Sequence, residues 1–243
     1  IEITAKIFLQ KDQDGSLLLD HILDVANQKG TGKWTGVSAL DLGVPVSLIT
    51  ESVYARCLSS LKEERLQAQK LFPQVTNSYT GTKTQLVVDI KQALYASKII
   101  SYTQGFMLMQ AAAKEMKWDF NYGSIALIWR AGCIIRSGFL NDIKKAYDVN
   151  PDLPSLLFDA FFKKAMINAE VSWRKVIITA VQAGIPIPCF SSALAFFDGY
   201  RSGYLPANLI QAQRDFFGAH TYERTDKPRE QFFHTDWNKI ENT

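Results

Sequence analysis

The chain has 243 residues, of which 47% are hydrophobic and 21% are charged, a balance typical of a globular protein with a sizeable core. Its formal net charge of +3 suits anionic small molecules but is too weak to indicate nucleic-acid binding. Apolar runs such as ALIWRAGCII are interrupted by charge well short of a membrane span, and no signal peptide is recognisable.

The first segment, IEITAKIFLQ, starts without methionine and already has the pattern of a helix interior. This start indicates that the sequence is a piece of a longer chain. The next periodic segment, residues 15–27, places Leu18, Ile22 and Val25 near one face with the spacing of an amphipathic helix. Asn27 tolerates the left-handed conformation of a helix C-terminal cap, so we expect the helix to end there.

The stretch NQKGTGKWTG, residues 27–36, follows and is predicted to be a loop. Its glycines, lysines and threonines supply the donors that a phosphate or a carboxylate requires. A Walker A loop is excluded, because Gly32-Lys33 is followed by Trp34 and the preceding element is a helix. The missing strand also argues against a dinucleotide-binding fingerprint. A solvated turn is the alternative interpretation.

Most of the remaining chain has the periodicity of helices. A long pattern covers residues 46–72 between two prolines, and a polar connector follows at 73–85. The next helix, 86–118, is unusually long and is expected to run through a core or a subunit interface. Further helices are predicted over 123–136, 138–149, 154–184, 191–201 and 206–218. Because alternating strand patterns are missing, the expected fold class is all-α with one very long central helix.

The last segment, residues 219–243, is polar and charged but carries aromatic residues such as Trp237. Such a segment cannot form a core of its own, and a simple polar tail would lack the aromatics. We therefore expect an extended arm that packs its aromatics against another surface. The predicted organisation is a helical domain over residues 1–218 and a C-terminal arm over 219–243.

Arg56, Arg214 and His220 stand near possible sites, and each has an ordinary structural explanation. Arg56 lies mid-helix among apolar neighbours, where an arginine commonly packs its stem and extends its head to solvent. Arg214 lies near a helix end and favours the negative end of the helix dipole. His220 follows in a loop, where a histidine is usually solvated or hydrogen-bonded. Taken singly, none of them defines a site.

Motif searches for metal sites and nucleophiles find nothing in the sequence. HExxH, CxxC and GxSxG are missing, and three scattered histidines give no ligand cluster. Cys57, Cys133 and Cys189 are odd in number and far apart, which argues against a disulfide framework. We therefore expect reduced thiols, a cytoplasmic protein and no metal.

Five strings carry a resemblance to a known family. They are ILDVANQKGTGKWT, VYARCLSSLKEER, ALIWRAGCIIRS, IPIPCFSSALAFFDGYR and LPANLIQAQRDFFGAHTYE, in that order over nearly the whole chain. Together they closely resemble the all-helical C-terminal part of the 6-phosphogluconate dehydrogenase family. KGTGKW and RDFFGAHTY are the specific strings, because helix propensity does not require them. Asn27 departs from the glycine common in the family, and we expect little effect because both residues end helices.

The resemblance implies an NADP-dependent enzyme that oxidises 6-phosphogluconate and decarboxylates it to ribulose 5-phosphate. Family members begin with a Rossmann domain that binds NADP, and its fingerprint is missing here. The lysine that acts as general base and the glutamate that acts as general acid belong to the segment before Ile1. We therefore expect no catalytic residue in this chain and no turnover by it alone.

For residues that are present, the resemblance implies substrate-binding roles. Lys29 and Thr31 are implied as donors to the substrate phosphate, and Arg56 as a guanidinium clamp on it. Arg214 and His220 are implied as contacts across a homodimer interface, to the phosphate and to the sugar hydroxyls respectively. Neither a nucleic acid nor a membrane is expected as a partner. Two alternatives are a non-catalytic helical module that dimerises or binds a sugar phosphate, and a related β-hydroxyacid dehydrogenase.

Overall fold

The computed structural model describes residues 1–73, 75 and 77–237, and the structural statements below concern these residues. Residues 74, 76 and 238–243, which belong to the predicted connector and the predicted arm, lie outside the described residues. The chain divides into two compact units, Ile1–Phe196 and Phe197–Thr243. The predicted organisation, with a boundary after residue 218 and an arm that reaches a partner subunit, stays a prediction.

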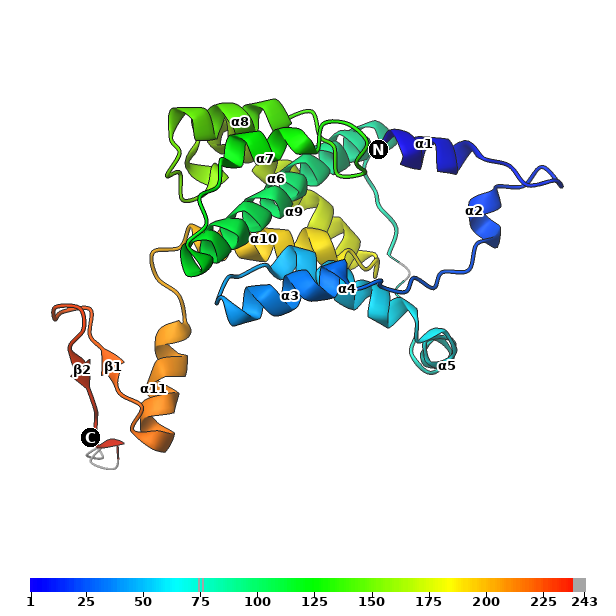
Figure 1. Cartoon of the computed structure of the whole chain (residues 1–243). Coiled ribbons are helices and arrows are strands. Elements are labelled where there is room, and N and C mark those ends of the chain that lie inside the picture. Colours follow the sequence, from blue (N-terminus) through cyan, green and yellow to red (C-terminus); the bar gives the residue numbers. More distant parts are fainter. Residues whose placement is uncertain (74, 76, 238–243) are drawn as a thin grey trace. The chain divides into compact units, whose positions relative to one another are not determined.

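The described residues form eleven α-helices, one 3-10 turn and a single two-stranded hairpin, which confirms the all-α fold class (Figure 1). The elements are α1 (Glu2–Leu9), α2 (Leu18–His21), α3 (Thr31–Asp41), α4 (Ser47–Ser59), α5 (Lys62–Leu71), α6 (Lys83–Met116), α7 (Tyr122–Ile128), α8 (Leu140–Val149), η1 (Leu156–Phe158), α9 (Ala160–Gln182), α10 (Pro188–Tyr200), α11 (Ala207–Gly218), β1 (Tyr222–Glu223) and β2 (Phe232–Phe233). None of the helices in this part of the chain has the length and apolar content to cross a membrane.

The long helix α6 is the element around which the first unit packs. The Thr82 hydroxyl caps its N-terminus by accepting a hydrogen bond from the amide of Gln85 at 3.3 Å. Lys117 ends it in the left-handed conformation, with a φ of 57°. Figure 1 shows α9 running beside α6, and the two helices pack together. Their buried side chains make up much of the core: Ala93, Ala96, Ile99, Ile100 and Phe106 on α6, and Phe162, Met166 and Trp173 on α9.

Three predicted helices differ from the structure, apart from the one over 154–184, whose α-helical part begins only at Ala160 after the extended Asp159. The pattern over 46–72 is two helices, because the chain turns at Ser60 and Leu61 between α4 and α5. The predicted helix over 123–136 ends at Ile128, and Gly132 has a φ of 67°, which ends helical geometry.

The third difference is the predicted helix over residues 15–27, which is wrong outside the single turn of α2. Residues 22–27 are not helical, and side chains of α4 and α5 bond several of their backbone groups. The amide of Ala26 donates to the Ser59 hydroxyl at 2.9 Å, and Arg65 donates to the carbonyl of Asp24 at 3.1 Å. Tertiary hydrogen bonds thus replace the helical ones that the sequence pattern predicts.

A buried side chain of α6 fixes the start of α4. Gln104 is fully buried, and its Oε1 accepts a hydrogen bond from the amide of Leu48 at 3.0 Å. Its Nε2 donates to the Ser47 hydroxyl at 3.1 Å. The N-cap residue of α4, Val46, has no polar side chain, so Gln104 satisfies one of the free amides at this helix N-terminus. This contact places α4 on the core.

Replacing Gln104 with leucine should therefore destabilise the chain. The substitution keeps the size of the side chain but leaves the buried amide of Leu48 without its acceptor, which costs about 1–3 kcal/mol. Urea unfolding followed by circular dichroism measures the change in the free energy of unfolding. Gln67→Leu on the exposed face of α5 is the matched control and should change it little. Equal effects of the two substitutions would contradict the capping role.

Candidate functional site

The stretch predicted as a phosphate-binding loop becomes helical at Thr31. Gly30 is the N-cap of α3 with a φ of 115°, a conformation that favours glycine, and its amide donates to the Gln28 side chain at 2.9 Å. The loop prediction is therefore correct only for residues 27–30. The first amides of a helix have no helical partners, and at the start of α3 Lys29 and Thr31 are both exposed. The arrangement is suited to an anion.

The other two glycines of the stretch have a packing role. An added Cβ at Gly32 would lie 2.6 Å from Cγ2 of Val53, and one at Gly36 would lie 3.5 Å from the Thr50 side chain. Both partners belong to α4, so the glycines at 32 and 36 let α3 approach α4 closely. Figure 1 shows the two helices next to each other. Sequence reasoning attributed all three glycines to the loop, whereas only Gly30 has a loop function.

Arg56 on α4 lies beside the segment that carries Lys29 and Thr31. Its Nη2 donates a hydrogen bond to the carbonyl of Asn27, two residues before Lys29. The side-chain Oδ1 of Asn27 in turn accepts a hydrogen bond from the Ser60 hydroxyl at 3.1 Å. Arg56, Lys29 and Thr31 are all exposed. The structure therefore brings these three predicted residues to one exposed region with two kinds of cationic group.

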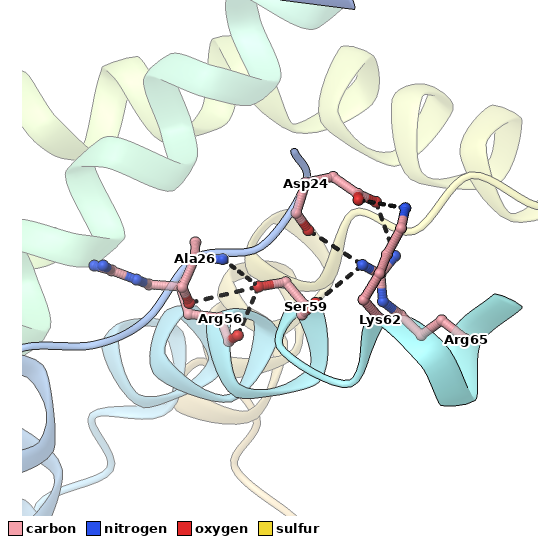
Figure 2. A network of polar contacts seen from close by, with 6 residues as sticks. All are labelled: Asp24, Ala26, Arg56, Ser59, Lys62 and Arg65. Atoms are coloured by element: carbon pink, nitrogen blue, oxygen red, sulfur yellow. Dashed lines mark hydrogen bonds and ion pairs between the residues drawn. The ribbon is translucent and has the colours of Figure 1, made fainter. Parts of the chain in front are cut away.

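A polar network ties the preceding residues to the junction of α4 and α5. Figure 2 shows Lys62 and Arg65 converging on Asp24. The Asp24 carboxylate accepts hydrogen bonds from Lys62 Nζ at 2.5 Å and Arg65 Nη1 at 2.9 Å. Arg65 Nη2 also donates to the carbonyls of Asp24, at 3.1 Å, and Ser59, at 2.9 Å. The hydrogen bonds from Arg65 and then Lys62 are the main reasons why the pKa of Asp24 is well below its usual range.

Ser59 is the second anchor of this segment. Its hydroxyl accepts the hydrogen bond from the amide of Ala26 and donates to the carbonyl of Arg56 at 2.7 Å (Figure 2). The segment 24–27 is therefore held at one end by α5 and at the other end by α4, the helix that carries Arg56. Sequence reasoning missed Asp24, Ser59 and Arg65, because about forty residues separate the partners and nothing in a single sequence links them.

The other two predicted substrate residues belong to the second unit, which is described by itself. Arg214 is exposed on α11, and its Nη1 donates to Gln211 Oε1 at 3.2 Å. His220 is also exposed, and its ring lies over Gly218, where an added Cβ would be 2.9 Å from Nε2. The relation of these two residues to Arg56 and Lys29 stays a prediction.

The hairpin of the second unit is fastened to α11 by one buried carboxylate. Asp215 is fully buried, and its Oδ1 accepts hydrogen bonds from the Thr221 amide at 3.0 Å and from His234 Nδ1 at 3.0 Å. Its Oδ2 accepts from the Thr235 amide at 3.1 Å and from Trp237 Nε1 at 2.8 Å. Burial by itself raises the pKa of Asp215, but the hydrogen bonds, led by that of His234, outweigh burial and lower the pKa. The carboxylate is therefore ionised at neutral pH.

Asp12, Asp14 and His21 form a further cluster that the motif search did not find. One ligand atom of each lies within 4.8 Å of the others, and all three residues are exposed. The Ser16 hydroxyl bridges Asp14 and His21, with oxygen and nitrogen partners at 2.5 and 2.7 Å. Exposed acidic groups often lie close together without a metal, so these residues do not define a metal site.

Comparison with known proteins identifies relatives over almost the entire chain. The family model described as 6-phosphogluconate dehydrogenase, C-terminal domain, matches residues 1–237. The chain is 62% identical over 238 residues to the mouse (Mus musculus) protein named 6-phosphogluconate dehydrogenase, decarboxylating. It is 57% identical over 237 residues to the protein of that name from Aggregatibacter actinomycetemcomitans. Each alignment covers 98% of this chain and 49% of the relative.

A solved structure supports the same relationship at the level of the fold. It is described as Plasmodium falciparum 6-phosphogluconate dehydrogenase in its apo form, with its cofactor NADP+ and with its substrate 6-phosphogluconate. The TM-score is 0.92 at 44% identity, and the match covers 97% of this chain and 51% of that chain. The chain thus spans about half the length of these relatives.

Substitution of Asp24 by asparagine should loosen the segment 24–27 without unfolding the chain. The amide of asparagine cannot accept both charged donors, so the Ala26 amide should exchange its hydrogen faster. Hydrogen exchange followed by mass spectrometry over residues 22–31 measures this. Asp148→Asn, which breaks an exposed ion pair with Lys144 within α8, is the control. Equal exchange in the two variants would disprove the anchoring role.

The same anchor predicts a pH dependence. The folded pKa of Asp24 is lower than the unfolded value of about 3.9, so its stabilising contribution is present above that value. The contribution is lost as the pH falls through the folded pKa. Protection of the Ala26 amide should therefore persist at pH 5 and decline only in stronger acid.

Proposed function

The chain belongs to the 6-phosphogluconate dehydrogenase family, and we propose that it forms the substrate-binding and dimerisation portion of an NADP-dependent enzyme. The proposed reaction oxidises 6-phosphogluconate and decarboxylates it to ribulose 5-phosphate and CO2. The names of the relatives support the reaction, and the Plasmodium falciparum complexes support the substrate and the cofactor. A cytoplasmic location and a homodimer are part of the same proposal.

The observation that carries the proposal is the position of Arg56 beside the segment of Lys29 and Thr31. A guanidinium, an ammonium, a hydroxyl and the free amides of a helix N-terminus are the donors that a phosphate dianion binds best. We assign the substrate phosphate to this place. Lys29 and Thr31 donate from the loop side, and Arg56 donates from α4. The Asp24 network keeps the loop in register with α4, so that the three donors converge.

Arg214 and His220 complete the proposed site from the neighbouring subunit. Arg214 supplies a second guanidinium to the phosphate, and His220 bonds a sugar hydroxyl. Both side chains are exposed in the single chain, and the arm extends beyond them with exposed aromatics such as Phe232. A homodimer with shared sites accounts for these exposed groups.

Phosphate binding has a chemical purpose in this reaction. NADP would take up a hydride from the substrate carbon that carries the C3 hydroxyl, and the resulting β-keto acid loses CO2. The phosphate is remote from that carbon, so the energy of binding it can be used to orient the reacting atoms. We place NADP binding and the acid–base pair in the part of the family's fold outside this chain. This chain then contributes orientation and affinity.

A non-catalytic helical module is the second candidate function. It would retain the fold and dimerise, but it would not need a cluster of exposed cationic groups beside a helix N-terminus. Binding of 6-phosphogluconate therefore separates the proposed function from a module that only dimerises.

Lys29→Ala and Arg56→Ala should each weaken binding of 6-phosphogluconate to the chain by about 10- to 100-fold. Each removes a charged hydrogen-bond donor worth about 1.5–3 kcal/mol, and 1.4 kcal/mol corresponds to a tenfold change. Isothermal titration calorimetry measures the affinity. Lys70→Ala on α5 removes an exposed cation of the same type and serves as the control. A dimeric chain that does not bind the sugar phosphate would favour the scaffold function.

The 243-residue chain alone should not turn over 6-phosphogluconate with NADP, because the proposed acid–base pair lies elsewhere. Formation of NADPH, followed by absorbance, tests this, with a full-length relative as the positive control. Robust turnover would show that the essential chemistry resides in this chain.

A further inference from the structure

We propose that Asp215 is a positioning residue that holds Arg214 and His220 in place through the arm. This inference rests on the substrate roles proposed for those two residues. Asp215 is fully buried in the last turn of α11, where the helix dipole disfavours a negative charge. A buried carboxylate at such a place is stable only when donors compensate both burial and the dipole. The four donors from the arm provide that compensation.

The backbone on both sides of His220 is in an uncommon conformation. Ala219 has a φ of 51° and Thr221 a φ of 59°, and residues other than glycine rarely adopt such values. Strain of this kind persists where the surroundings fix it, and it often marks a functional position. Asp215 fixes both residues: its carbonyl accepts from the Ala219 amide at 2.9 Å, and its Oδ1 accepts from the Thr221 amide. His220 thus lies between Ala219 and Thr221, whose amides are both bound by Asp215.

Gln211 links Arg214 to Thr221. Its Nε2 donates to the carbonyl of Thr221 at 2.6 Å, while its Oε1 accepts the hydrogen bond of Arg214. Side chains of α11 therefore hold both the amide and the carbonyl of Thr221. A change at Asp215 that frees Thr221 would disturb His220 directly and Arg214 through Gln211.

The residues after β2 also bind Asp215. His234, Thr235 and Trp237 donate to the same carboxylate, and the Trp237 ring packs beside Phe216 with the ring centroids 6.2 Å apart. Trp237 thus finds partners on α11 of its own chain. The carboxylate of Asp215 therefore binds both ends of the hairpin to α11.

The test is Asp215→Asn in the whole chain. Asparagine has nearly the same size, but its amide replaces an acceptor with a donor and removes the charge. We expect faster hydrogen exchange at the Thr221 and Thr235 amides and at least about a tenfold loss of affinity for 6-phosphogluconate by calorimetry. Asp226→Asn is the matched control, because Asp226 is an exposed aspartate of the same hairpin, paired with Arg224. It should leave the affinity unchanged.

A cycle with the variant Arg214→Ala/His220→Ala separates positioning from general stabilisation. If Asp215 acts through these two residues, adding Asp215→Asn to that variant should weaken binding little further. Additive losses would overturn the proposal, and so would a normal affinity of Asp215→Asn when His220→Ala binds weakly. If neither Arg214→Ala nor His220→Ala changes the affinity, the proposed substrate roles are wrong, and the positioning role is wrong with them.

A milder variant covers the case in which Asp215→Asn does not fold. Trp237→Phe removes one of the two donors to Oδ2 of Asp215 and retains an aromatic ring beside Phe216. It should raise hydrogen exchange over residues 219–237 and weaken 6-phosphogluconate binding by a smaller factor than Asp215→Asn. Unchanged exchange and unchanged affinity would overturn the proposal.

Discussion

The packing of α6 against α9 is the interaction on which the first unit depends. Fully buried alanines on α6 and large fully buried side chains on α9, such as Trp173, occupy the same core. A polar contact accompanies this apolar packing: the Ser172 hydroxyl on α9 donates to the buried Asp89 carboxylate on α6 at 2.5 Å. A buried hydrogen bond of this kind specifies one register between two helices that apolar packing alone would allow to slide. The positions of the smaller helices follow from this register.

The candidate phosphate site is connected to that register by hydrogen bonds. Gln104 of α6 fixes the start of α4, and α4 carries Arg56 near its other end. The network of Asp24 and Ser59 then fixes the loop before α3 on α4. At each of these contacts, a side chain of one element forms a hydrogen bond with a backbone amide or carbonyl of the next element. These bonds fix the position of each element relative to its neighbour. The backbone that carries the exposed Lys29 and Arg56 is therefore fixed by hydrogen bonds, although the two side chains are exposed.

The sequence predicts the long helix well and the site only in part, for physical reasons. The helix over 86–118 is found at Lys83–Met116, because its periodic apolar residues are in fact buried on the core. Residues 22–27 have a similar pattern but form no helix, because their hydrogen bonds go to Ser59 and Arg65, which no local rule contains. Gly32 and Gly36 were attributed to a ligand, whereas they serve helix packing. One local signal for Asp215 existed: an acidic residue in the last turn of a helix is disfavoured and requires compensation.

The two carboxylates that support the proposed site differ in how firmly they can hold it. Asp24 is exposed and its two cationic partners are half-buried, so salt screens the attraction and the segment can move at modest cost. Asp215 is buried beneath the hairpin, where screening is weak and loss of one donor leaves the buried charge less well compensated. Of the proposed substrate contacts, those of Lys29, Thr31 and Arg56 are therefore the adaptable ones. The proposed contacts of Arg214 and His220 are preorganised by Asp215. The entropic cost of ordering the site on substrate binding would therefore arise mainly at the loop that carries Lys29.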